Sequence, residues 1–167
     1  MEIVQVPDPI LRKVAEKVRD YNSELEKLVK DMAETMYSAM GIGLAGNQVG
    51  VLKQLAIIDV SKPEEKKNLL VLINPEIVER EGLEQMEEGC LSVPEFRQVV
   101  PRSAKIRVRA RNLKGEEFEL TAEGLLARAI QHELDHLNAK LILDYANPMI
   151  KELYLKRRKK LLKRSKI

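Results

Sequence analysis

Apolar residues recur at helical spacing between residues 122 and 139, which predicts one helix entered from a cap at Thr121. Its apolar positions are Leu125, Leu126, Ala129, Ile130, Leu134 and Leu137. This helix is expected to be central, with the predicted sheets packed on it.

A second helix is predicted from Ser23, where Glu26 three residues later completes a capping box. Gly41 is a natural end for it. The stripe expected to be buried comprises Leu25, Leu28, Val29, Met32, Met36, Ala39 and Met40. We interpret this methionine-rich stripe as core.

Strand patterns occupy much of the remaining sequence. Residues 54–60 and 69–74 are apolar runs typical of buried strands. Residues 104–111 and 116–120 alternate polar and apolar positions on either side of a turn at 112–115. The predicted fold class is therefore α+β, with largely antiparallel β-sheets packed around the central helix.

The chain ends in a predicted helix, with Asn147 as its cap and Pro148 as its first residue. At 167 residues the protein is expected to form one domain. Residues 1–147 make up its body, and residues 148–167 form a C-terminal basic helical extension of the same domain.

Charge is unevenly distributed along the chain, although the formal net charge is only +3. Residues 148–167 contain nine Lys and Arg against one acid, Glu152, which leaves 20 basic and 25 acidic residues in the body. A basic tail on an acidic body suggests a polyanionic partner, usually nucleic acid. A solubilising end is the alternative interpretation.

The sequence contains no apolar run of the roughly 20 residues needed to cross a membrane. Its first residues lack the basic start and apolar stretch of a signal peptide. Cys90 is the one cysteine, so an internal disulfide is excluded and a reducing compartment is favoured. We therefore expect a cytoplasmic protein without a membrane partner.

The only two histidines, His132 and His136, lie four residues apart on the central helix. Residues at this spacing share one helix face, so both imidazoles can bind one metal ion, and Glu133 beside them can reach water at that metal. A helix with two incidental histidines is the alternative.

A catalytic metal site of this kind uses three protein ligands, so the third ligand must be Cys90 or a carboxylate. A thiolate is the softer ligand for iron or zinc. Two other interpretations of Cys90 remain: a small buried apolar residue, or a nucleophile with a histidine as its base.

Three segments resemble the motifs of the peptide deformylases. They are Gly-Leu-Ala-Gly-Asn-Gln at 43–48, Glu-Gly-Cys-Leu-Ser at 88–92 and Gln-His-Glu-Leu-Asp-His at 131–136. Their order and spacing fit that family over essentially the whole chain. Two departures stand out: Gly46 where the family usually has alanine, a change expected to loosen the substrate loop, and Ala139 where glycine is usual.

The resemblance implies a metal-dependent hydrolase that removes the formyl group from the N-terminal formylmethionine of nascent polypeptides and releases formate. It implies that Cys90, His132 and His136 bind Fe²⁺, for which Zn, Ni or Co can substitute. Glu133 then acts as general base and acid. The Gln48 side chain and the Leu91 backbone N–H stabilise the oxyanion.

Substrate contacts are expected beside this site. Leu125 and Ala129 precede the histidines on the helix and are positioned to line a methionine pocket. Ile42, Gly43 and Leu44 are expected to hold the peptide in an extended form through backbone hydrogen bonds. Asp135 either pairs with Arg102 or is solvated.

Two other functions compete with this one. A zincin-type endopeptidase usually takes its third ligand from a downstream histidine or carboxylate, which Cys90 would displace. An RNA- or ribosome-binding module explains the basic tail but not the histidine pair. For a deformylase, the resemblance implies that the tail docks on ribosomal RNA.

Overall fold

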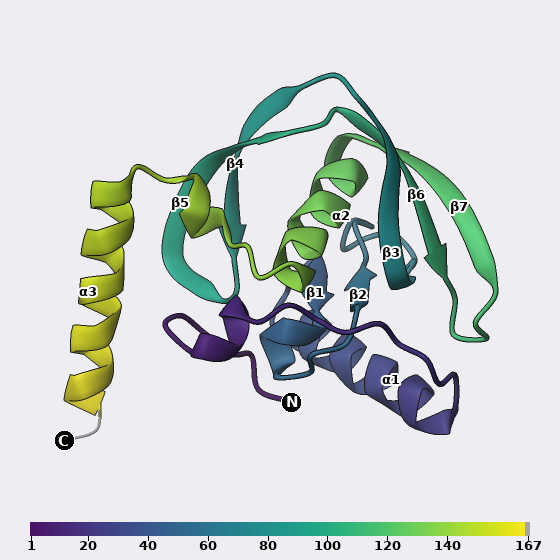
Figure 1. The fold of residues 1–167 in the computed structure, drawn as a ribbon, viewed down its shortest axis with the longest axis horizontal. Helices are drawn as coiled ribbons and strands as arrows, with labels where there is room; N and C mark the ends of the chain where they lie inside the picture. Colours follow the sequence, from purple (N-terminus) through teal and green to yellow (C-terminus); the bar gives the residue numbers. More distant parts are fainter. Residues whose placement is uncertain (166–167) are drawn as a thin grey trace.

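A computed structural model describes residues 1–165 of the chain, and the last two residues of the predicted basic extension lie outside this range. Over the described residues the fold is α+β, as predicted, with three α-helices and seven strands (Figure 1). The helices are α1 (Ser23–Ser38), α2 (Gly124–Leu137) and α3 (Pro148–Ser165). Short 3-10 turns occupy Pro9–Arg12, Gly46–Val49 and Ile142–Tyr145.

The strands form two antiparallel sheets. Five of them pair in the order β1-β2-β3-β6-β7, and β4 and β5 form a separate hairpin. Their bounds are β1 Gly43–Ala45, β2 Leu55–Ile58, β3 Leu70–Glu81, β4 Glu84–Cys90, β5 Val93–Arg102, β6 Lys105–Arg111 and β7 Glu117–Glu123. Figure 1 shows α2 between this hairpin and the strands β3, β6 and β7.

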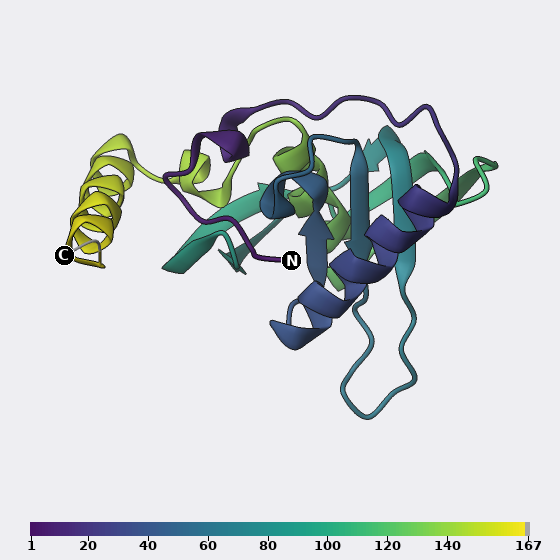
Figure 2. The same cartoon turned by 90° about the horizontal axis from the view of Figure 1, so that it is seen from below.

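The five-stranded sheet separates two layers of apolar side chains. Ile58 of β2 faces α2, where it joins a buried cluster with Ile130 and Leu134. Leu55 and Ile57 of the same strand pack instead with residues of α1. Figure 2 shows α1 crossing the strands on that side. Because successive side chains of a strand point to opposite faces, one buried strand serves both layers.

The central helix begins later than the sequence pattern predicted. Thr121 and Ala122 belong to β7, where they pair with Arg107 and Ile106 of β6. Pairing with β6 keeps these residues extended, and the chain turns into α2 at Gly124, whose φ of +59° is readily available to glycine. The prediction of a cap at Thr121 is therefore wrong.

The first helix starts where expected, but its cap differs. Asn22, and not Ser23, is the capping residue, and its Oδ1 accepts a hydrogen bond of 3.1 Å from the Leu25 backbone N–H. Met40, predicted to continue the buried stripe, follows the end of α1 and is 90% exposed. The predicted cap of the C-terminal helix is confirmed, since Asn147 Oδ1 accepts a hydrogen bond from the Met149 N–H at the start of α3.

None of the helices within residues 1–165 combines the length and apolar composition needed to span a membrane.

Candidate metal centre and active site

Two elements bring the three predicted metal ligands together. His132 and His136 lie one turn apart on α2, and Cys90 ends strand β4. Cys90 Sγ lies 3.3 Å from His136 Nε2, which lies 3.3 Å from His132 Nε2. The three donor atoms all lie within 4.8 Å of one another. One thiolate and two imidazole nitrogens converging on one point fit a zinc-like or iron-like ion.

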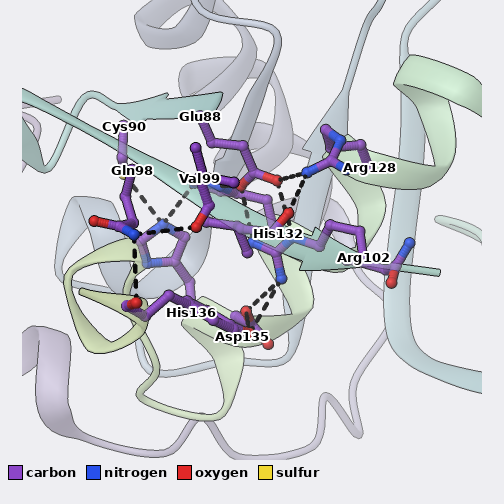
Figure 3. Close-up of polar contacts among 12 residues, drawn as sticks. Glu88, Cys90, Gln98, Val99, Arg102, Arg128, His132, Asp135 and His136 are labelled. Carbon is purple, nitrogen blue, oxygen red and sulfur yellow. Dashed lines mark hydrogen bonds and ion pairs between the residues drawn. The ribbon is translucent and has the colours of Figure 1, made fainter. Parts of the chain in front are cut away.

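The opposite nitrogen of His132 fixes the ring's tautomer. His132 Nδ1 lies 2.9 Å from Glu88 Oε1, a carboxylate that accepts the Nδ1 proton (Figure 3). The lone pair on Nε2 is then directed toward Cys90 and His136, which is the usual arrangement around a metal-binding histidine.

His136 is buried, and its environment favours the neutral ring. Burial, followed by the positive charge of His132 and Arg102, holds the pKa of His136 well below its usual value. For His132, burial lowers the pKa, but the acidic groups of Glu133, Cys90 and Glu88 outweigh it and raise the value. Without a metal, these acidic groups favour a second proton on the ring of His132, and a metal ion bound at Nε2 would take the place of that proton.

Glu88 is the centre of a buried ionic network that the sequence analysis missed. Its carboxylate accepts hydrogen bonds from Arg102 Nε and Nη2 at 3.0 and 2.9 Å, and from Arg128 Nη1 at 2.5 Å (Figure 3). Burial alone would raise its pKa, but hydrogen bonds from His132 and Arg102 lower it to about 2. Glu88 is therefore an anion held among three positive or proton-donating groups.

Arg102 extends this network to Asp135. Its Nη1 lies 2.6 Å from Asp135 Oδ2, which also accepts a 2.8 Å hydrogen bond from the Tyr145 hydroxyl. Of the two alternatives for Asp135, the structure supports the pair with Arg102. A signal for this network was present on α2, because Arg128 precedes His132 by four residues and therefore shares its helix face. The structure shows that Arg128 is buried there.

Glu133 is buried next to the histidines. Its Oε1 has no hydrogen-bond partner among the described residues. Burial raises its pKa to about 7, against the opposing influence of His132 and Arg102. A Cβ added at Gly43 would overlap Glu133 Oε2, so β1 can approach this carboxylate only with glycine at that position. The glycine-rich segment thus permits a close backbone approach, in this case to Glu133.

Gln48 is buried with both ends of its amide engaged. Its Oε1 accepts a 3.0 Å hydrogen bond from the Ala45 N–H, and its Nε2 donates to Ser92 Oγ at 3.1 Å. The same Nε2 lies 3.6 Å from Cys90 Sγ. The amide therefore presents its N–H side toward the metal ligands.

A cavity of about 750 Å³ opens beside these groups. Of the predicted site residues, it is lined by Ile42, Gly43, Gln48, Cys90, Leu91, Leu125, Ala129, His132 and Glu133. Leu125 is 55% exposed and stands at the mouth. His136 and Leu44 are not among the lining residues, and the fully buried Leu44 packs into the core beside α1. Met40, Met86, Phe96, Arg97 and Arg128 line the cavity without having been predicted.

The two departures from the family motifs have different structural consequences. A Cβ at Gly46 would lie 2.6 Å from the Val51 carbonyl oxygen, so the backbone is closely packed here, unlike the looser loop expected. Ala139 has a φ of +63°, which is the left-handed region where glycine is favoured.

Comparisons with known proteins agree with this geometry. Residues 1–152 match the model of the polypeptide deformylase family. A peptide deformylase of Acidobacterium capsulatum is 50% identical over 159 residues, which cover 95% of this chain and 94% of that protein.

Two crystal structures share the fold. The peptide deformylase of Legionella pneumophila is 42% identical, with a TM-score of 0.87 over 98% of this chain and 97% of that one. The peptide deformylase of Ehrlichia chaffeensis is 34% identical, with a TM-score of 0.92 over 100% and 99%. The match covers both the Cys90 strand and the histidine helix, and this chain belongs to the polypeptide deformylase family, the hydrolases that remove the formyl group from the N-terminus of nascent polypeptides.

Proposed function

We propose that Cys90, His132 and His136 bind the catalytic metal, with Fe²⁺ as the native ion and Zn, Ni or Co as substitutes. The observation that carries this proposal is the convergence of their three donor atoms within 4.8 Å. A bound divalent ion supplies Lewis-acid chemistry, lowering the pKa of water from its bulk value toward neutrality.

Glu133 is the proton carrier in this proposal. Its buried Oε1, which has no partner among the described residues, is available to accept a proton from the attacking water. The same carboxyl then returns the proton to the departing amine of the methionine residue, so that formate and a free N-terminus are formed. Because the site lies in a cavity next to β1, the carboxyl is held close to the substrate backbone.

The oxyanion that develops on the formyl group requires hydrogen-bond donors. We assign this role to the Gln48 side chain and the Leu91 backbone N–H, both of which belong to residues lining the cavity. The bonds that Gln48 makes to Ala45 and Ser92 hold its amide in place before substrate arrives. Preorganised donors of this kind typically contribute ~10²–10³-fold in kcat.

Different parts of the site contact the methionine side chain and the backbone of the substrate. Leu125 and Ala129 offer apolar surface for the methionine side chain at the cavity. Strand β1 is an edge of its sheet, so an extended peptide can add along its unpaired side, beside Ile42, Gly43 and Leu44. The Ile42 carbonyl oxygen itself already accepts a hydrogen bond from the Asp59 N–H. The buried Leu44 side chain takes no part in this contact.

Substitutions at Cys90 and Glu133 test the chemistry separately from metal binding. Cys90→Ala, and nearly as strongly Cys90→Ser, is expected to lose metal and activity together, because a hydroxyl is a much poorer ligand than a thiolate. Glu133→Gln should keep the metal while turnover falls by ~10²–10⁴-fold. Metal content and formate release from a formyl-Met peptide are measured on the same samples. Full metal occupancy in Cys90→Ala, or near-normal kcat in metal-loaded Glu133→Gln, would contradict the assignment.

The identity of the metal is tested by purification with and without oxygen. A thiolate-ligated Fe²⁺ is expected to be oxygen-sensitive, so the iron protein prepared anaerobically should be the most active and should lose activity in air. Removal of the metal by a chelator should abolish turnover, and Ni²⁺ or Co²⁺ should restore an air-stable activity. Equal activity of aerobic zinc protein and anaerobic iron protein would contradict iron as the native metal.

We further propose that residues 1–147 form the catalytic deformylase domain and that residues 148–167 dock on ribosomal RNA in the cytoplasm. A charged pocket on α3 supports this, since Lys156, Arg157, Lys159, Lys160 and Lys163 line it. Electrostatic docking should weaken steeply with salt as counterions are released. Such docking would bring the active site to emerging formylated chains.

The docking proposal is tested by charge removal. Replacing Lys159, Lys160 and Lys163 with glutamine should weaken cosedimentation with ribosomes and leave turnover of a short formyl-Met peptide unchanged. As a matched control, three lysines outside α3, at positions 62, 66 and 67, are replaced in the same way. Equal cosedimentation of the two variants at low salt would refute a docking role for α3.

A further inference from the structure

Helix α3 contacts the body of the protein along one face. Its half-buried positions include Lys151, Tyr154 and Arg158, which recur at intervals of three and four residues and therefore share a face. Lys151 Nζ lies 2.9 Å from Asp144 Oδ1, and Arg158 Nε donates to the Val6 carbonyl oxygen at 3.1 Å. Figure 1 shows the helix at the edge of the molecule on the side of β5.

Tyr154 on this face reaches a wall of the substrate cavity. Its hydroxyl donates a 2.6 Å hydrogen bond to the Pro94 carbonyl oxygen, and its ring lies 5.0 Å, centroid to centroid, from the ring of Phe96. Phe96 lines the cavity, as do Glu95 and Arg97 on either side of it. Tyr154 also packs against the apolar cluster that contains Val93.

The backbone between these two contacts has an unfavourable conformation. Glu95 has a φ of +58°, although it is not glycine and lies within strand β5. Such a conformation persists only where surrounding contacts determine it. Tyr154 holds the residue on each side of Glu95, by a hydrogen bond to Pro94 and by ring contact with Phe96.

Arg158 supports the other end of the same segment indirectly. Val6 links Arg158 to Ser92. Its carbonyl oxygen accepts a hydrogen bond from Arg158, and its N–H donates to the Ser92 carbonyl oxygen at 2.9 Å. Ser92 Oγ in turn accepts the hydrogen bond from Gln48 Nε2. The docked face of α3 therefore supports residues 92–96 at two points.

We propose that Tyr154 is a positioning residue for substrate binding, which holds Pro94, Glu95 and Phe96 in the conformation that forms one wall of the cavity. This inference rests on the proposed use of the cavity for the formylated peptide. Helix α3 then has two separate faces: a basic outer face, and an inner face that shapes the active site. A truncation that removes Tyr154 alters both.

The test compares three variants of the full-length, metal-loaded enzyme with a formylated tripeptide as substrate. Tyr154→Ala is expected to raise KM about 3–10-fold, in line with the loss of a hydrogen bond and a ring contact, while kcat changes by less than about twofold. Tyr154→Phe keeps the ring and should give a smaller rise in KM. Leu153→Ala is the matched control, because Leu153 is the preceding residue of α3 and is 61% exposed.

Hydrogen exchange supplies a readout besides activity. In Tyr154→Ala, the amides of Val93, Glu95, Phe96 and Arg97 should exchange faster, while those of α2 keep the protection of the wild type. Unchanged KM and unchanged exchange at 93–97 would overturn the proposal, and so would faster exchange throughout the molecule, which indicates a general loss of stability. If Tyr154→Ala does not fold, Tyr154→Phe decides the question by the same two measurements.

Failure of the positioning role of Tyr154 can be told apart from failure of the proposed role of Glu133 in catalysis. Glu133→Gln is assayed in parallel with the same peptide. Retained turnover in Glu133→Gln would refute the proposed mechanism whatever the Tyr154 variants show. Loss of turnover in Glu133→Gln with an unaltered KM in both Tyr154 variants would refute only the positioning role.

Discussion

Neutralising Glu88 should destabilise the protein more than any other change of a single charge in the ionic network at the site. Glu88→Gln keeps the shape of the side chain but removes the anion that faces Arg102 and Arg128. The side chains of these two arginines are only 4% and 7% exposed, so water cannot replace the lost partner. Removing one member of a buried ion pair typically costs about 3–5 kcal/mol. Asp135 still pairs with Arg102, so we expect the lower end of this range, about 3 kcal/mol.

The matched control is the neighbouring residue in β4. Glu87 pairs with Arg97 at 2.6 Å, but their side chains are 58% and 61% exposed. Exposed pairs of this kind contribute about 0–1 kcal/mol, so Glu87→Gln should be close to wild type. Urea unfolding at pH 7 of the metal-free proteins measures both free energies of unfolding. A difference of less than 1 kcal/mol between the two variants would refute the view that burial makes Glu88 indispensable.

Glu88→Gln should also weaken metal binding, because Glu88 accepts the proton of His132 Nδ1. Loss of such a partner typically costs about 10–100-fold in metal affinity. Competition titration with a chromogenic chelator measures the dissociation constant for Zn²⁺ in the wild type and both variants. Equal affinity in Glu88→Gln and wild type would show that packing alone orients His132.

Three further substitutions test other features of the structure. Ala139→Gly should stabilise the protein by about 0.5–1 kcal/mol, measured by urea unfolding, because relief of the left-handed strain exceeds the entropy that glycine adds to the unfolded chain. Gly43→Ala should lower kcat with little change in global stability, since the new methyl group displaces the Glu133 carboxylate; an unchanged kcat would exclude this contact from the mechanism. Burial opposes a low pKa for Asp144, but Arg12, the Leu141 N–H and Lys151 lower the value below 3.8. The stabilisation from Asp144 is therefore complete above about pH 4 and is lost as the pH falls below it, so the stability difference between wild type and Asp144→Asn should shrink in acid unfolding curves.

The sequence predicted those features of the site that depend on spacing within one element. His132 and His136 share a face because residues four apart on any helix do so, whatever surrounds the helix. The position of Cys90 beside them did not follow from periodicity, because it depends on how β4 packs against α2. That contact came from the resemblance to a family, and the structure supplies its geometry.

Features that depend on distant partners were missed or wrong. The pattern of residues 122–139 is compatible with a helix throughout, and only the pairing of Ala122 with Ile106 shows that the first part is strand. Glu88 looked like one acid among several, because its partners Arg102 and Arg128 lie 14 and 40 residues away. Leu44 was predicted to contact the substrate through its backbone, and alternation along β1 turns its side chain into the core without affecting that role.

Glu88 and Arg128 of the ionic network lie on the same two elements as the metal ligands, the end of strand β4 and one face of helix α2. Glu88 and Cys90 are two residues apart at the end of β4, where the pairing with β5 is irregular after Gly89, and both side chains contact histidines of α2. Arg128, His132 and His136 are four residues apart on α2, so they form one stripe facing that hairpin. Where Glu88 contacts Arg128 and His132, the Sγ of Cys90 lies 3.3 Å from His136 Nε2 one turn further along α2. The charges that make the α2 face costly to bury are thus neutralised by the same docking step that brings the three metal-binding groups together.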